Sequence, residues 1–401
     1  MKILKHIIPV KDTSPVLIST GTEKQLPYVV SKDWVIRGQD DGVVKDINEK
    51  TKMVLLEYKN GAREVVNLNP VVVKNGGGGF YLSNVLTMKY KKGQKFKKND
   101  IIAYNKDYFS EHYDGTKFNI GTLCKVAIMS SYATFEDAKT ITEGLSERMA
   151  TEMVMQKKVI LGPNATVEKI MKVGDDVVVG NDLIVYEQSN EEEEMNKMLS
   201  NIGDQLKEDI KAMGKSSLKS KYSGVIEDIR IYSTLDSKDL SPSLGKIVSE
   251  YWKGIKAKKE FITKNKITDY SMQGNTFYEV DGPIEPDATG KVKGYKIDEG
   301  VIIEFYIKIN DPVGVGDKLC DFAALKGVVA LVIPKGQEPY TLDTPDEEIS
   351  TIFPATSVLA RKVPSIIPTM MGNKLLIELK NQLKSIYETG EIEYRYGKKS
   401  V

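Results

Sequence analysis

A seven-residue pattern occurs three times in this chain and constrains its fold more than any other feature. The pattern has Val or Phe first, Gly or Asn fourth, Asp or Asn fifth and Leu or Ile seventh, and it covers residues 96–102, 177–183 and 313–319. Gly and Asn accept the positive φ angle that tight turns need, and an apolar residue after such a turn begins a strand. We therefore predict a tight turn that enters a strand at each place, as in interlaced β-barrels.

Local signals elsewhere predict an α+β fold that is mainly β. Residues 42–47 (GVVKDI) are echoed by residues 224–229 (GVIEDI), and both look like strand starts. Asn60-Gly61 lies between two apolar runs and predicts a β-hairpin. A strand is also expected at residues 291–297. Apolar residues at helical spacing predict amphipathic helices over residues 191–213, 243–264 and 373–389.

Two lysines lie at the ends of a short apolar connection within residues 309–330. Lys318 follows the turn signal Gly316-Asp317, and Lys326 precedes Gly327 and a β-branched run. Two ammonium groups on such a hairpin can both reach one polyanion, because lysine presents a compact charge on a long stem. The alternative is a surface hairpin with two solvated lysines.

A second basic feature is the run KYKKGQKFKK at residues 89–98, which contains six lysines. With its interleaved Tyr90 and Phe96, it suits a nucleic-acid backbone, which basic side chains bind without regard to sequence. Lys89, Lys91 and Lys92 are the candidate contacts. The alternative is a solvated charged face.

Two further motifs have both a functional and a structural interpretation. Glu136 and Asp137 are adjacent carboxylates, which could approach a hydrated magnesium ion or could form a turn or a helix cap. They cannot form a facing glycosidase pair, because neighbouring side chains point in different directions. The four glycines at residues 76–79 predict a plain loop or a spacer near nucleic acid; no Lys-Ser/Thr follows them, which argues against a P-loop.

Composition excludes several classes of protein. Lys and Arg number 57 against 56 Asp and Glu, which argues against a simple DNA-coating protein. The two cysteines, Cys124 and Cys320, lie far apart, so a disulfide framework is not expected and a reducing compartment fits. The two histidines nearly exclude His-based metal or triad chemistry. We expect neither a transmembrane helix nor a signal peptide.

Six blocks of the chain, in order, resemble the beta subunit of multisubunit RNA polymerases. Residues 316–328 are similar to the family's G-D-K-M-A-G-R-H-G-N-K-G-V, with Phe322 and Ala323 in place of Arg and His. Residues 121–143 are similar to G-x-N-x-x-V-A-F-M followed by Y-N-[FY]-E-D-[AS]-I-x-[IV]-S-E. Arg361 corresponds, with an offset of one residue, to the arginine of G-V-P-S-R-M-N-I-G-Q. The remaining blocks are residues 15–23, 31–33 and 338–354.

The resemblance implies a double-psi β-barrel with an inserted flap domain and flanking helices. Residues 1–150 would form the N-terminal part of the barrel and a hybrid-binding region, and residues 151–275 a flap-like insertion with amphipathic helices. Residues 276–335 would complete the barrel and carry the lysine hairpin. Residues 336–401 would form a C-terminal extension and helix.

The resemblance also implies the C-terminal part of a split beta subunit of a DNA-directed RNA polymerase, as in giant bacteriophages. Lys318 and Lys326 would contact the RNA 3′ end or the incoming triphosphate, Arg361 would contact nucleic acid, and Glu136 and Asp137 would lie near a second Mg²⁺, with water between. A D-F-D-G-D motif does not occur in this chain. The principal Mg²⁺ ligands are therefore expected on a beta-prime-like subunit, without which this chain would be inactive.

The partners implied by this resemblance are the N-terminal beta-like part, beta-prime-like parts, a promoter-specificity factor at the flap, DNA, RNA and nucleoside triphosphates, with no membrane. The implied location is the cytoplasm of an infected bacterium or the virion. The alternative from another class is a non-catalytic nucleic-acid-binding or virion structural protein built on β-barrel modules. Such a protein would bind DNA through residues 89–98 with strong salt dependence.

Overall fold

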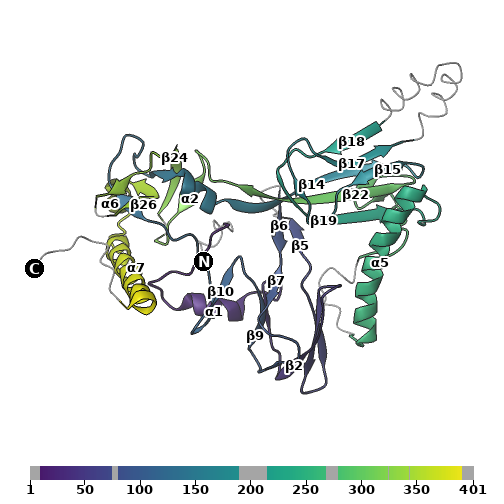
Figure 1. The fold of residues 1–401 in the computed structure, drawn as a ribbon, viewed down its shortest axis with the longest axis horizontal. Helices are drawn as coiled ribbons and strands as arrows, with labels where there is room; N and C mark the ends of the chain where they lie inside the picture. The colour runs from purple at the N-terminus through teal and green to yellow at the C-terminus, as the bar shows by residue number, and fades with distance from the viewer. Residues whose placement is uncertain are drawn as a thin grey trace, which may run out of the picture. The chain divides into compact units, whose positions relative to one another are not determined.

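The protein is described by a computed structural model that covers residues 10–74, 80–188, 215–267, 279–323, 325–342 and 344–390 (Figure 1). It divides into two compact units. Unit 1 consists of Met1–Val30, Lys106–Glu152 and Asn310–Val401, and unit 2 consists of Ser31–Asn105 and Met153–Ile309. The described part is mainly β with few helices, as predicted. None of its helices has the length and apolar composition of a membrane span.

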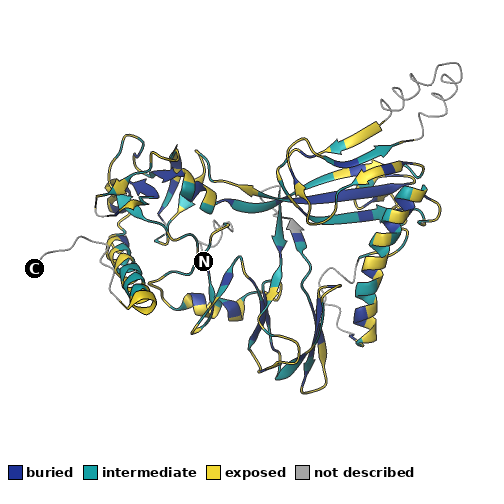
Figure 2. Ribbon diagram, viewed as in Figure 1, coloured by how far each residue is buried: buried dark blue, intermediate teal, exposed yellow. Residues whose placement is uncertain are grey.

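Unit 2 is built on a six-stranded sheet with the order β16-β19-β22-β14-β6-β5. β22 is buried along most of its length (Figure 2), and its Phe305 is fully buried. Helix α5 packs on this sheet through Leu244 and Val248, and the Ser241 side chain caps its first turn. The helix predicted over residues 243–264 is thereby confirmed. The bounds are β5 Val71–Lys74, β6 Tyr81–Asn84, β14 Thr151–Leu161, β16 Asp176–Val177, β19 Gly224–Ser233, β22 Val301–Asp311 and α5 Pro242–Lys264.

Two smaller sheets of unit 2 share a second apolar core. The predicted Asn60-Gly61 hairpin is confirmed, because β3 and β4 pair antiparallel and Gly61 has a φ of 84°. Phe96 is buried in this core, and Tyr90 packs against it. The sheets have the orders β4-β3-β2-β8 and β1-β9-β7. Their bounds are β1 Val35–Arg37, β2 Gly42–Asn48, β3 Met53–Tyr58, β4 Arg63–Asn67, β7 Leu86–Met88, β8 Lys95–Phe96 and β9 Ile101–Asn105.

The recurring seven-residue pattern forms the same turn at all three places. Its fourth residue has a positive φ each time: 67° at Asn99, 90° at Gly180 and 97° at Gly316. The fifth residue donates its backbone N–H to the carbonyl of the second residue. This hydrogen bond, together with the positive φ of the fourth residue, defines a type II turn. The side chain of the fifth residue also accepts the N–H of the second at 2.8–3.0 Å. The predicted tight turns are confirmed.

Two of these turns belong to a duplicated module within unit 2. β8 pairs with β2 so that Phe96 lies opposite Gly42, and β16 pairs with β19 so that Val177 lies opposite Gly224. A β-bulge follows at the same position in each copy, after Val44 and after Ile226. The echo between residues 42–47 and 224–229 therefore marks equivalent strands.

The rest of unit 2 includes one departure from prediction. Residues 291–297 were expected as one strand but form the hairpin β20 (Lys291–Val292) and β21 (Tyr295–Lys296). Lys293 and Gly294 both have positive φ angles, as a type I′ turn requires, and this turn reverses the chain. A three-stranded sheet has the order β15-β17-β18, with bounds Thr166–Ile170, Asp182–Glu187 and Lys215–Lys219.

Unit 1 carries a five-stranded sheet of mixed direction with the order β12-β27-β13-β24-β23. β13 runs parallel to β24, and β23 runs antiparallel to it. The bounds are β12 Val126–Ile128, β13 Ala138–Thr142, β23 Lys318–Cys320, β24 Lys326–Ile333 and β27 Thr351–Phe353. Short hairpins are β10 Phe109–His112 with β11 Gly115–Phe118, and β25 Tyr340–Thr341 with β26 Thr344–Glu348.

The helices of unit 1 are α1 Thr22–Val29, α2 Glu143–Arg148, α6 Ala355–Ala360 and α7 Ile366–Thr389. α7 ends at Gly390 as predicted but begins seven residues before the expected residue 373. Pro368 permits this earlier start because it lies in the first turn, where its missing N–H is not needed.

Several predictions are left without a structural test. Among the described strands no sheet closes into a barrel, so the double-psi β-barrel is not confirmed and stays a prediction. The helix at residues 191–213 and the glycines at residues 76–79 lie outside the described residues. The division into four consecutive family segments also stays a prediction.

Candidate functional site

The structure places Lys318 and Lys326 on one face of a hairpin in unit 1. Lys318 lies opposite Val328 and Cys320 lies opposite Lys326 in the β23–β24 pair. Because side chains alternate along a strand, these four share a face, and the two lysines are diagonal neighbours. Such neighbours lie about 7–8 Å apart. Neither ammonium group has an ion-pair or hydrogen-bond partner in the described part of the chain, so both charges are available to a ligand.

The turn before Lys318 fixes the hairpin against the sheet. The N–H of Gly316 donates to the carbonyl of Val329 at 2.8 Å, and the N–H of Val329 donates to the carbonyl of Asp317 at 2.8 Å. Gly327 lies where β24 approaches β13 closely. A Cβ atom at Gly327 would stand 2.1 Å from the carbonyl oxygen of Asp137, so glycine alone fits there.

The adjacent carboxylates lie beside this hairpin, at the start of β13. Glu136 has a φ of 48°, and its carbonyl accepts a hydrogen bond from Ser357 of α6. Asp137 forms an ion pair with Arg361, and this hydrogen bond raises the pKa of Arg361. Two residues predicted from separate blocks, Asp137 and Arg361, are thus partners of each other.

These two carboxylates are too few to bind a metal ion without water, so they suit an ion that keeps most of its water ligands. Within the described ranges no group of three or more His, Cys, Asp or Glu side chains could hold a metal. Glu136 is exposed and its carboxylate has no partner among those residues, whereas Asp137 is engaged by Arg361. One or two carboxylates with several waters is the arrangement that Mg²⁺ accepts.

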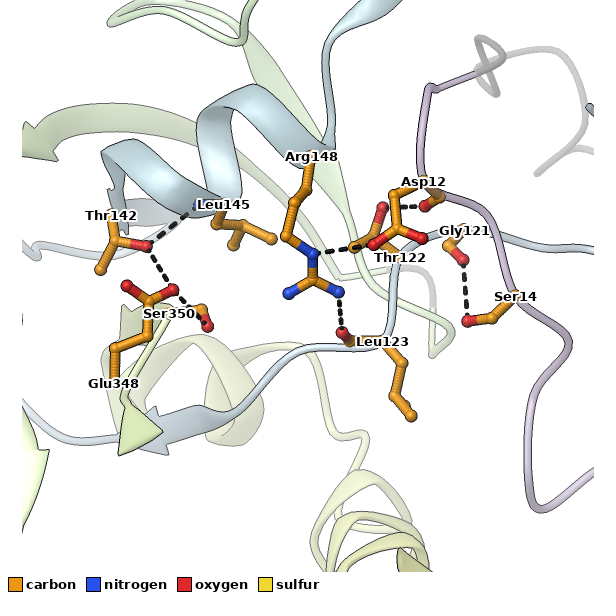
Figure 3. Close-up of polar contacts among 10 residues, drawn as sticks. All are labelled: Asp12, Ser14, Gly121, Thr122, Leu123, Thr142, Leu145, Arg148, Glu348 and Ser350. Carbon is orange, nitrogen blue, oxygen red and sulfur yellow. Dashed lines mark hydrogen bonds and ion pairs between the residues drawn. The ribbon is translucent and has the colours of Figure 1, made fainter. Parts of the chain in front are cut away.

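A polar network fixes the junction between β13 and α2 (Figure 3). The Thr142 hydroxyl accepts from the N–H of Leu145 at 3.2 Å and donates to Glu348 Oε1 at 3.0 Å. At the other end of α2, Arg148 Nε donates to Asp12 Oδ2 at 2.8 Å. These contacts fix β13, the strand that supports the hairpin. The side chains that make them are hydrogen-bonded to one another or to the backbone, so they are not free to bind a ligand.

The lysine run at residues 89–98 belongs to unit 2. Of its two aromatic residues, Phe96 is buried because strand alternation turns it into the core, and Tyr90 packs against that core and is partly buried. Lys92 forms an ion pair with Asp46 at 2.6 Å, which lowers the pKa of that carboxyl. The second copy of the module has Val178 and Val179 where the first has Lys97 and Lys98. The turn itself therefore does not require lysines.

Sequence reasoning missed two residues under the hairpin, Lys139 and Asp321. Lys139 lies in β13 and is only 5% exposed, and burial lowers its pKa. Its Nζ atom is 3.8 Å from Asp321 Oδ2, and burial raises the pKa of Asp321. The available signal was a single lysine within the strand run AKTIT, whose other side chains are uncharged.

The chain matches a known protein family. A family model described as RNA polymerase Rpb2, domain 6, matches residues 125–350, which is more than half of the 401-residue chain. The matched region contains the lysine hairpin, Glu136 and Asp137, whereas Arg361 and the lysine run lie outside it. No curated protein matches the chain.

Proposed function

Because this chain belongs to the RNA polymerase Rpb2, domain 6, family and is a beta-like subunit of a DNA-directed RNA polymerase, we propose that Lys318 and Lys326 bind phosphate groups in its active centre. The observation that carries this proposal is the pair of ammonium groups on one hairpin face, inside the matched region, neither of which has an ion-pair partner among the described residues. Their ligand would be the incoming triphosphate or the RNA 3′ end.

The chemistry needs little covalent help from the protein. Phosphoryl transfer depends on positioning the reacting groups and on neutralising the charge that develops on the phosphate oxygens. Two ammonium groups on a rigid hairpin would do both. When bound, Mg²⁺ supplies further neutralisation of phosphate charge. Glu136, with Asp137, would hold a second Mg²⁺ through water, and a beta-prime-like subunit would supply the principal ligands.

The finer parts of the proposal rest on the resemblance in sequence. They are the double-psi barrel, the flap that meets a promoter-specificity factor, and the split subunit of a giant-bacteriophage enzyme, located in the infected cell or the virion. Arg361 would contact nucleic acid by exchanging its partner Asp137 for a phosphate. Lys89, Lys91 and Lys92 would bind a nucleic-acid backbone.

The family implies other RNA polymerase subunits as partners, and helix α7 offers a surface for one of them. Figure 2 shows exposed residues along the length of α7, alternating with residues of intermediate burial. Met371, Leu375, Leu379 and Leu383 form one apolar stripe and are 46–68% exposed. A stripe with four-residue spacing suits an apolar helix or groove of another subunit. We propose that another polymerase subunit covers it.

We predict that Leu379→Glu with Leu383→Glu will lower the recovery of partner subunits about tenfold or more, because two charges would be buried in the interface. Recovery is measured by co-purification with the tagged chain. Lys384→Glu, on the polar side of α7, is the control and should recover normal amounts. Equal recovery from the leucine variant would show that the stripe does not bind a subunit.

The same purification separates the polymerase proposal from its rival. A polymerase subunit must travel with several large chains, one of them carrying a D-F-D-G-D loop. A non-catalytic nucleic-acid-binding or virion structural protein would be recovered alone or self-associated.

A further inference from the structure

The connection between β23 and β24 is held at both of its ends by one buried cation. Lys139 Nζ donates to the carbonyl of Leu325 at 2.8 Å and lies 3.8 Å from Asp321 Oδ2. Asp321 directly follows β23, and Leu325 directly precedes Lys326. A single side chain from β13 therefore contacts the connection immediately beside each strand that carries a phosphate-binding lysine.

Asp321 shapes the same connection from within. Its Oδ1 atom accepts the N–H of Ala323 at 3.0 Å and of Leu325 at 2.9 Å, as aspartate does in tight turns. Its Oδ2 atom is buried and has no hydrogen-bond partner in the described part of the chain, and the positive charge that faces it is the Lys139 ammonium. The Lys139 ammonium also lies over the Phe353 ring, 5.4 Å from its centroid.

A gain in folding stability does not explain well why Lys139 and Asp321 are buried together. Burial opposes the charged form of both groups, and a buried ion pair can often be replaced by uncharged residues without loss of stability. What the pair does supply is a fixed geometry, because the ammonium cannot contact Leu325 and Asp321 together unless these two residues keep one position relative to each other.

We infer that Lys139 is a positioning residue that, with Asp321, sets the spacing and direction of Lys318 and Lys326 for phosphate. The inference rests on the proposed function of the two lysines. Lys139 itself is buried and would not touch the substrate. It would act through the hairpin, as a support that keeps two mutually repelling ammonium groups at one distance before the ligand arrives.

The test uses the reconstituted polymerase carrying Lys139→Met with Asp321→Asn, which removes both charges together and leaves no buried charge unpaired. We expect KM for the nucleoside triphosphate to rise about tenfold while the thermal midpoint stays within a few degrees of the parent value. A structural role alone would move the midpoint and leave KM of the folded enzyme unchanged. The control is Lys24→Met with Asp114→Asn, an ion pair between α1 and the β10–β11 turn of the same unit, which should leave KM unchanged.

A second comparison separates this inference from the function on which it rests. In enzyme that already carries Lys318→Ala and Lys326→Ala, removing the Lys139–Asp321 pair should not raise KM any further. The pair is expected to act on KM only through the two lysines, which this enzyme lacks. An unchanged KM in the charge-free variant would overturn the positioning role while the lysines stay essential. Normal activity without the lysines would overturn the proposed function itself.

Discussion

Replacing Lys318 and Lys326 together with alanine should slow nucleotide addition by the reconstituted polymerase about 10²–10³-fold, the usual cost of losing a group that stabilises developing charge. The structure supports a large effect because both ammonium groups share one face of the β23–β24 hairpin and neither is neutralised by another described residue. Single-nucleotide extension of a preformed RNA–DNA scaffold measures this step without the influence of promoter binding.

The matched control is Lys335→Ala, which removes an exposed lysine from the same unit just beyond the end of β24. It should extend RNA at the parent rate. The double-alanine enzyme must also assemble normally, which co-purification of its subunits checks. Assembled double-alanine enzyme that extends RNA as fast as the control would exclude the two lysines from the active centre.

Gly327→Ala should destabilise unit 1 by about 3 kcal/mol, at the upper end of the usual cost of overpacking. The new Cβ would stand 2.1 Å from the Asp137 carbonyl oxygen and 2.9 Å from Lys139 Cε, so β24 must move away from β13. Hydrogen exchange should then accelerate in peptides that cover these two strands, because their pairing is broken in the variant.

Two controls test whether this effect comes from the close approach of Gly327 to the Asp137 carbonyl oxygen. Gly121→Ala lies in the same unit with no atom within 4 Å of the added Cβ, and it should leave exchange unchanged. Trp34 and Trp252, the only tryptophans, both lie in unit 2, so the midpoint followed by their fluorescence should not shift. A Gly327→Ala protein with parent-like exchange in β13 and β24 would contradict the packing described here.

The resemblance located the hairpin and the carboxylates, but their partners could not be predicted from local pattern. Lys139 and Leu325 are 186 residues apart, and Asp137 and Arg361 are 224 residues apart. Nothing in the neighbourhood of either residue specifies such a partner. Phe96 shows the same limit of local pattern. The lysines around it predicted a basic surface, but the pairing of its strand turns the Phe96 side chain into the core.

The sequence by itself determined the features that depend on a few consecutive residues. Positive φ angles at Asn99, Gly180 and Gly316 follow from the residue types and the residue after them, because Gly and Asn alone accept that conformation at little cost. The Asn60-Gly61 hairpin and the amphipathic helix α5 are local in the same sense. Tertiary structure alone decided which strands pair across long stretches of chain, that Asp137 meets Arg361, and that Lys139 is buried against Asp321. Those contacts join segments distant in the chain, and only the packing of the whole sheet brings such segments together.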